Sequence, residues 1–148
     1  MAAIREFAVC VDSHVSKMDV LNAVRERTKE SIANSIGESY CEHLLRLRPS
    51  RSDVGPATVL ISYMWSDDFH QFIAALEERF GQDESGDTFL WIDLFSINQH
   101  DDSISERWLS EFEQQILRIN HTVLILSPPC DRIDINHLPP LKRLTLYV

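Results

Sequence analysis

The sequence predicts an α/β domain built on a parallel β-sheet. Three short, continuous apolar runs at 58–63, 88–93 and 122–127 are rich in β-branched residues, as strands covered on both faces are. Amphipathic segments long enough for crossover helices separate these runs, which gives the order β-α-β-α-β. Such units carry helices on both faces of the sheet, and their ligands collect beyond the carboxyl ends of the strands.

Composition limits the class of protein. The chain has 148 residues, 44% of them hydrophobic, which suits one ordinary domain with a single core. The net charge of -9, from 23 acidic and 14 basic residues, argues against nucleic acid as a partner, because phosphate binding needs a basic surface. Three widely spaced cysteines, no signal peptide and no run of 18 apolar residues predict a cytoplasmic protein without a membrane segment.

Residues 1–53 are expected to form a helical extension. Apolar residues recur there at multiples of four, at Val20, Val24, Ile32 and Ile36. Ser16 is a candidate cap for this helix and Gly37 a candidate stop. A second short helix is predicted over 39–48, with three apolar residues on one side, Tyr40, Leu44 and Leu47. Segment 7–11 fits a strand or ordered coil, and turn formers at 49–56 indicate a connector.

Residues 54–148 are expected to form the α/β domain itself. The clearest helix has apolar residues at helical spacing, at Phe69, Phe72, Ile73, Leu76 and Phe80. Asp68 precedes this helix as a candidate cap and Gly81 follows it. The next helix begins at a capping box formed by Ser103 and Glu106, and its apolar residues are Leu109, Phe112, Ile116 and Ile119.

Three loops share the predicted ligand edge of the sheet, at 64–68, 94–102 and 128–140. Their acidic residues could hold a divalent cation through carboxylate oxygens: Asp67, Asp68, Asp93, Asp101 and Asp102. Helix capping and the helix dipole account for the same residues, so we predict no metal site. Trp65 lies in the first of these loops, where it could stack on a flat ligand or close over the core.

Other catalytic patterns are weak. Cys130 and His137 share one proline-rich loop, but no third group is present to orient them, so an inert pair is expected. Neither GxGxxG nor a Walker-type loop is present. A phosphoacceptor domain that uses Asp93 would have the same architecture, yet no lysine follows at the end of a further strand.

Two stretches, "ISYMWSDDF" and "LWIDLFSINQ", followed by a Trp-containing helix and "TVLILSP", resemble the TIR-like superfamily. One similar branch is the fungal heterokaryon-incompatibility (HET) domain, with its S-Y-x-W and W-I-D-x-x-x-I-N-Q signatures. The other is a set of protist TIR-like proteins with W-I-D-x-F-S-x-N-Q and a preceding "VGPAT". The resemblance covers about residues 54–130.

The resemblance implies a flavodoxin-like, TIR-type fold with three α/β/α layers. It also implies a signalling role in immunity, cell death or stress, exerted through self-association or a protein partner. The ligand edge would consist of Ser62, Trp65, Ser66, Asp93, Asn98 and Gln99. Within the loop, Asp93, Asn98 and Gln99 are expected to fix the backbone by hydrogen bonds, after a strand at the centre of the sheet.

Many TIR domains cleave NAD with a glutamate on the helix after the third strand, and NAD is the one cofactor that the resemblance suggests. In the protist form this helix reads R-A-W-C-L-x-E. Laid on residues 139–148, the pattern meets Arg143, Leu146 and Tyr147, but Val148 stands at the glutamate position. Valine cannot act as a base, so we expect a module that is not catalytic on its own.

The alternative is an NAD(P)-cleaving hydrolase whose glutamate comes from elsewhere, since Glu106 and Glu111 are on the wrong helix for the family role. A TIR-type sheet has five strands, and only three are legible in the sequence, unless 7–11 supplies one. We therefore expect a C-terminally incomplete domain, or one whose exposed sheet edges are covered by a partner.

Overall fold

The computed structural model describes residues 2–9, 17–29, 37–64, 68–83, 85–100, 106–125 and 144–147. The helices are α1 (Ala2–Ala8), α2 (Lys17–Thr28), α3 (Tyr40–Leu47), α4 (Phe69–Phe80), α5 (Asp93–Ser96) and α6 (Glu106–Ile119). The strands are β1 (Val59–Tyr63), β2 (Leu90–Trp91), β3 (Thr122–Ile125) and β4 (Leu144–Tyr147). They form one parallel sheet in the order β2-β1-β3-β4, which confirms the predicted α/β class.

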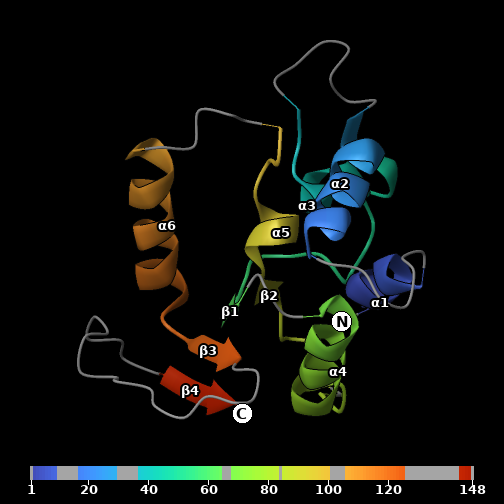
Figure 1. Ribbon diagram of the computed structural model, residues 1–148. Helices are drawn as coiled ribbons and strands as arrows, with labels where there is room; N and C mark the ends of the chain where they lie inside the picture. The colour runs from blue at the N-terminus through green and yellow to red at the C-terminus, as the bar shows by residue number, and fades with distance from the viewer. Residues whose placement is uncertain are drawn as a thin grey trace.

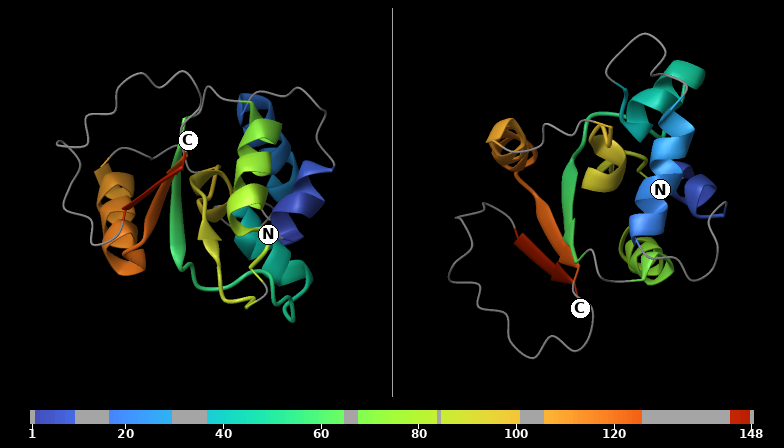
Figure 2. Two further views of the ribbon diagram at one scale, coloured as in Figure 1. Left: turned by 90° about the horizontal axis from the view of Figure 1, so that it is seen from below. Right: turned by 45° about the horizontal axis from the view of Figure 1, so that its top comes forward.

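Helices lie on both faces of this sheet, with α6 on one side and α1 to α5 on the other (Figures 1 and 2). The alternation along β1 explains the arrangement, because neighbouring side chains point to opposite faces. Val59 and Ile61 belong to the core cluster shared with helices α1 to α4. On the opposite face, the ring of Trp91 lies 5.5 Å from that of Phe112 in α6.

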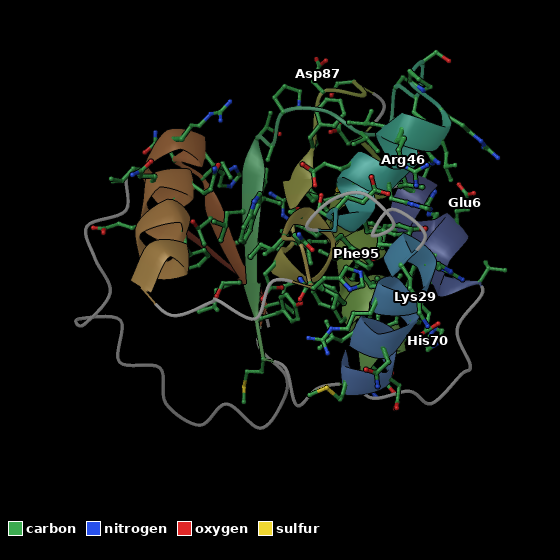
Figure 3. All side chains as sticks on the ribbon, turned by 90° about the horizontal axis from the view of Figure 1, so that it is seen from above. Glu6, Lys29, Arg46, His70, Asp87 and Phe95 are labelled. Carbon is green, nitrogen blue, oxygen red and sulfur yellow. The ribbon has the colours of Figure 1, made fainter. Side chains whose placement is uncertain are left out.

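A single hydrophobic cluster joins helices α1 to α3 to the sheet. Its centre is aromatic: Phe7 is fully buried, and its ring centroid lies 5.1 Å from Tyr40 and 5.2 Å from Phe95. Phe95 lies between the helices and the sheet, whereas Glu6 and Arg46 lie at the periphery (Figure 3). Residues from both sides of the predicted 53/54 boundary therefore share one core.

The first segment differs from expectation. Residues 2–8 form helix α1, so the interpretation of 7–11 as a strand or ordered coil is wrong for Phe7 and Ala8. The apolar segment is too short to show a helical period. Helix α1 is anchored in the core by one large side chain, that of Phe7. The remaining part of that segment, 10–11, lies outside the described residues.

The other two N-terminal helices follow the prediction in part. Val20 and Val24 of α2 are buried, but α2 ends at Thr28, and Ser16, Ile32 and Ile36 lie outside the described residues. Helix α3 begins at the predicted position, with a capping box between Ser39 and Glu42. Of the three apolar residues predicted to share one side of this helix, Tyr40 and Leu44 are buried, and Leu47 is not. It is 58% exposed, because it ends the helix beyond the core.

The predicted central unit is confirmed for β1, α4, α6 and β3. The five apolar residues that the helical spacing identified in α4 are all buried, and Asp68 caps the helix by accepting a hydrogen bond from the Gln71 backbone N–H at 3.0 Å. Helix α6 occupies its predicted place, although Ser103 and the side chain of Leu109 lie outside the described residues. No helix within the described ranges is both long and apolar enough to span a bilayer.

Two strands differ from expectation. Strand β2 was predicted to be central, but it contains only Leu90 and Trp91 and lies at one edge of the sheet, because the chain enters α5 at Asp93. Strand β4 (Leu144–Tyr147) occupies residues that the resemblance aligned with a catalytic helix, so that alignment is wrong. It pairs in parallel with β3, so the described residues form a sheet of four strands, whereas the sequence revealed three.

Candidate functional site

The candidate site lies at the carboxyl ends of β1 and β2. Asp93, Asn98 and Gln99 lie together in one segment that follows β2. Ser62 is opposite Leu124 in the β1–β3 register, on the face that carries α6, so it does not share their side of the sheet. Trp65 and Ser66 lie outside the described residues.

Tyr63 and Asp93 join the ends of the two strands. The Tyr63 hydroxyl donates a hydrogen bond to Asp93 Oδ1 at 2.6 Å, and the same oxygen accepts the Leu94 backbone N–H at 2.7 Å. The Tyr63 ring stacks on Phe72 of α4, with 4.4 Å between the ring centroids. The last residue of β1 is thus held by a carboxylate on one side and an aromatic ring on the other.

This environment predicts a specific response to alkaline pH. Burial raises the pKa of Tyr63 above its ordinary value of 10.0, and the negative charge of Asp93 raises the pKa further. The folded protein therefore holds the phenol proton more tightly than the unfolded chain does. The resulting stability is fully present below about pH 10 and is lost as the pH rises beyond it.

We expect the free energy of unfolding to fall more steeply above about pH 10 in the wild type than in Tyr63→Phe, which has no phenol to ionise. Denaturant titrations at several pH values from about 8 to 11 would measure the difference. Tyr40, whose pKa burial also raises, is present in both proteins and cancels in the comparison. Parallel pH curves would contradict the prediction.

The segment from Asp93 to His100 is fixed by its own side chains, as predicted. Gln99, only 9% exposed, donates from Nε2 to the Asp93 carbonyl oxygen at 2.9 Å. Asn98 Oδ1 accepts the His100 backbone N–H at 3.0 Å. Both side chains bond to backbone groups of their own segment, so the two amides fix the conformation of the loop.

Helix α2 holds the same loop from outside. Arg25 donates from Nε to the Gln99 carbonyl oxygen at 2.8 Å, and the fully buried Thr28 hydrogen-bonds His100 Nε2 through its hydroxyl at 2.7 Å. Gly37 packs against the loop with φ at +75°, and a Cβ there would lie 3.0 Å from Asn98 Oδ1. Glycine fits this position because other residues would be strained and crowded.

Three residues of this network were not predicted from the sequence, namely Arg25, Thr28 and Tyr63. Arg25 and Thr28 are more than 70 residues from their partners in the loop, so no local pattern could reveal them. Tyr63 ends a strand that the sequence identified, and its position at the predicted ligand edge was the available signal.

The described carboxylates near the strand ends have structural partners. Asp68 caps α4, and Asp93 accepts hydrogen bonds from Tyr63 and Leu94. Within the described ranges, no group of three His, Cys, Asp or Glu side chains could hold a metal ion. Asp67, Asp101, Asp102, Cys130 and His137 lie outside those ranges. The described arrangement is therefore suited to fixing the shape of a loop.

In comparisons with protein-family models, curated proteins and solved structures, no significant match to this chain was found. The most informative geometry is the hydrogen-bonded loop that ties β2 to β1 and α2.

Proposed function

We propose that this chain is a signalling or protein-interaction module of the TIR-like kind, similar to HET and protist TIR-like domains, and that it is not catalytic on its own. The strand order β2-β1-β3-β4 supports the proposal, because it matches the first four positions of the flavodoxin-like order 2-1-3-4-5. The position of "LWIDLFSINQ" also supports it, since this stretch supplies β2 and the loop at its carboxyl end.

The observation that carries the proposal is the engagement of the Asp93 carboxylate. A general base or nucleophile needs a lone pair that can reach a substrate. Asp93 is partly buried, and its Oδ1 accepts the Tyr63 hydroxyl and the Leu94 N–H. Its place in the network favours a structural role over both acid–base chemistry and phosphate acceptance. The loop would then present a fixed surface to a partner or a small ligand.

The proposal predicts that purified protein releases no more nicotinamide from NAD than a buffer control. It also predicts concentration-dependent self-association, because the family role that the resemblance implies is exerted through assembly. Chromatographic quantification of nicotinamide and sedimentation velocity over a hundred-fold concentration range would measure the two properties.

Asp93→Asn, Glu106→Gln and Glu111→Gln are the informative variants for the activity assay. Nicotinamide release that is lost in one of them would replace the proposal with an NAD(P)-cleaving hydrolase. A protein that stays monomeric throughout the concentration range would contradict the self-association component. NAD binding without turnover, measured by calorimetry, would agree with a ligand-sensing module.

A further inference from the structure

A hollow of about 250 Å³ opens between α3 and α6, and we call it the interhelical hollow. Glu42 of α3 lines it on one side, and Gln115 and Arg118 of α6 line it on another. Trp91 of β2 is also part of its wall. Pockets for cofactors and drug-sized ligands usually measure about 300–1,000 Å³, so the interhelical hollow suits a small molecule.

The Glu42 carboxylate is held in a fixed position by the cap of α3. Its Oε2 accepts the Ser39 backbone N–H at 2.7 Å and the Ser39 hydroxyl at 2.8 Å, as part of the capping box. Among the described residues, its Oε1 accepts no hydrogen bond. The carboxylate is therefore ordered before a ligand arrives, and it keeps an oxygen that can accept a donor.

Gln115 and Arg118 carry donors on the opposite side of the hollow. They are three residues apart in α6, so they lie on the same face of the helix. Within the described ranges, neither side chain makes a hydrogen bond or an ion pair, and Arg118 forms none with Glu42. A guanidinium beside a primary amide offers several N–H groups that suit a carboxylate.

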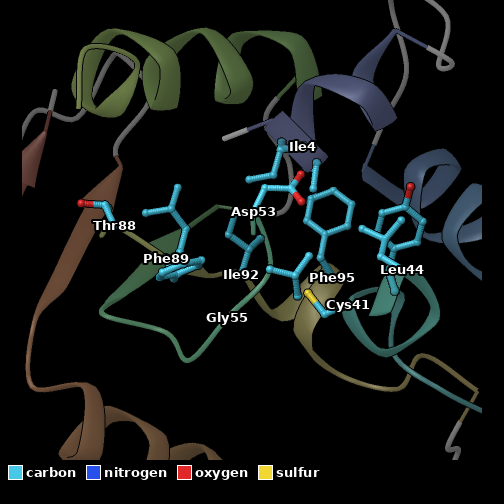
Figure 4. Close-up of a pocket in the computed structure, with 13 residues that line it drawn as sticks. Ile4, Cys41, Leu44, Asp53, Gly55, Thr88, Phe89, Ile92 and Phe95 are labelled. Carbon is cyan, nitrogen blue, oxygen red and sulfur yellow. The ribbon is translucent and has the colours of Figure 1, made fainter. Parts of the chain in front are cut away.

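A smaller hollow of about 60 Å³ shares the wall formed by Cys41 and Leu90 and provides a contrast. Figure 4 shows the apolar side chains around it, among them Ile4, Leu44 and Phe95. Its one carboxylate, that of Asp53, already accepts two hydrogen bonds from Arg51, both at 2.6 Å. An ionic ligand therefore matches the interhelical hollow and not the smaller one.

The two charges of the interhelical hollow select the class of ligand. A ligand that carries only a carboxylate would meet Glu42 as well as Arg118, and like charges repel each other. A simple amine would meet Arg118 in the same way. A molecule with an ammonium at one end and a carboxylate at the other matches both sides. Its methylene groups could lie on the apolar part of the wall, at Trp91 and Ile119.

We propose that the interhelical hollow binds a small linear zwitterion. The ammonium of this molecule pairs with Glu42, and its carboxylate pairs with Arg118 and Gln115. The hollow includes neither Tyr63 nor Asp93, so the inference goes beyond the proposed function. Its test is independent of NAD turnover and of self-association.

The probes are ω-amino acids of increasing length: glycine, β-alanine, γ-aminobutyrate, δ-aminovalerate and ε-aminocaproate. NMR titration of the isotope-labelled full-length protein measures their affinity. We expect the affinity to pass through a maximum at one chain length, because a linker binds best when its length matches the distance between two sites. The signals of the Trp91 indole N–H and of the Arg118 backbone amide should move during the titration.

Two variants and two probe analogues identify the contacts. Glu42→Gln removes the charge but keeps the capping box, which glutamine also forms. Arg118→Gln removes an exposed charge and leaves the core intact. Each variant should bind the best probe about five-fold more weakly than the wild type does. Glu42→Gln should no longer distinguish this probe from its N-acetyl derivative, and Arg118→Gln should no longer distinguish it from its amide.

Glu78→Gln and Arg48→Gln are the matched controls. Both residues are exposed, and neither lines the interhelical hollow, so both changes should leave the affinity unchanged. Thermal unfolding shows whether each variant is folded. If a variant does not fold, the N-acetyl and amide analogues test the same contact on the wild type, since each lacks one of the two charges.

Three results would overturn the proposal. The first is the absence of binding by every probe at millimolar concentration. The second is an affinity that does not depend on chain length, which would mean that the two ends do not bind at fixed positions. The third is equal affinity of the wild type for the best probe, its N-acetyl derivative and its amide, which would remove the need for either charge.

Discussion

Replacing Phe7 with alanine is expected to lower the free energy of unfolding by about 3–5 kcal/mol, the range for truncating a buried aromatic side chain. Phe7 is fully buried and packs against the rings of Tyr40, Phe69 and Phe95. The guanidinium of Arg27 lies 4.4 Å from its ring centroid, which adds a cation–π contact. Guanidinium chloride unfolding at equilibrium would measure the change.

Val9→Ala provides the control. Val9 lies only two residues after Phe7 in the sequence, but its side chain is 87% exposed. This change is expected to alter stability by no more than about 0.5 kcal/mol. A loss below about 1 kcal/mol in Phe7→Ala would mean that the site collapses around the missing ring and that α1 contributes little to the fold.

Replacing Asp93 with alanine is expected to lower the free energy of unfolding by about 2–4 kcal/mol, because two donors lose a shared acceptor in a partly buried site. The donors are the Tyr63 hydroxyl and the Leu94 backbone N–H. Because the loop from Asp93 to His100 closes on this point, its amides should also exchange with deuterium faster in the variant. Denaturant unfolding and hydrogen exchange would measure the two effects.

Asp93→Asn separates charge from hydrogen bonding, since its amide oxygen can still accept both donors, and it should cost clearly less than alanine. The double variant Tyr63→Phe with Asp93→Ala should cost less than the sum of the single changes, because removing both partners leaves no orphaned hydroxyl. Additive costs would mean that the Tyr63–Asp93 hydrogen bond does not couple the two strand ends.

The sequence predicted those elements whose apolar residues have a clear period. Helix α4 has five buried residues at helical spacing, and β1 and β3 lie in continuous apolar runs that are rich in β-branched residues. Strand β2 was predicted to be central because Leu90 to Ile92 are apolar. It is short because the chain turns into α5 at Asp93, and a helix of four residues is too short to show a helical period in the sequence. Strand β4 was missed because the resemblance aligned its residues with a helix.

Only those contacts of the candidate site that are local in the sequence could be predicted. Asp93, Asn98 and Gln99 were expected to bond to nearby backbone, and all three do so within six residues. The contacts of Arg25 and Thr28 with the loop depend on how α2 docks. Helix α2 docks by burying Val20 and Val24 in the common core. The periodicity of apolar residues predicts that this face is buried, but it does not predict which element the face packs against.

The contact between Phe7 and Phe95 joins two residues that a ribosome synthesises far apart in time. Phe95 is synthesised about 90 residues after Phe7, which takes roughly 5 to 20 s at ordinary elongation rates. Throughout that interval the aromatic side chain of the nascent chain has no native ring from the loop after β2 to pack against. Helix α1 is therefore synthesised well before its final environment exists, and a chaperone that binds exposed aromatic residues would find a site at Phe7 during that interval.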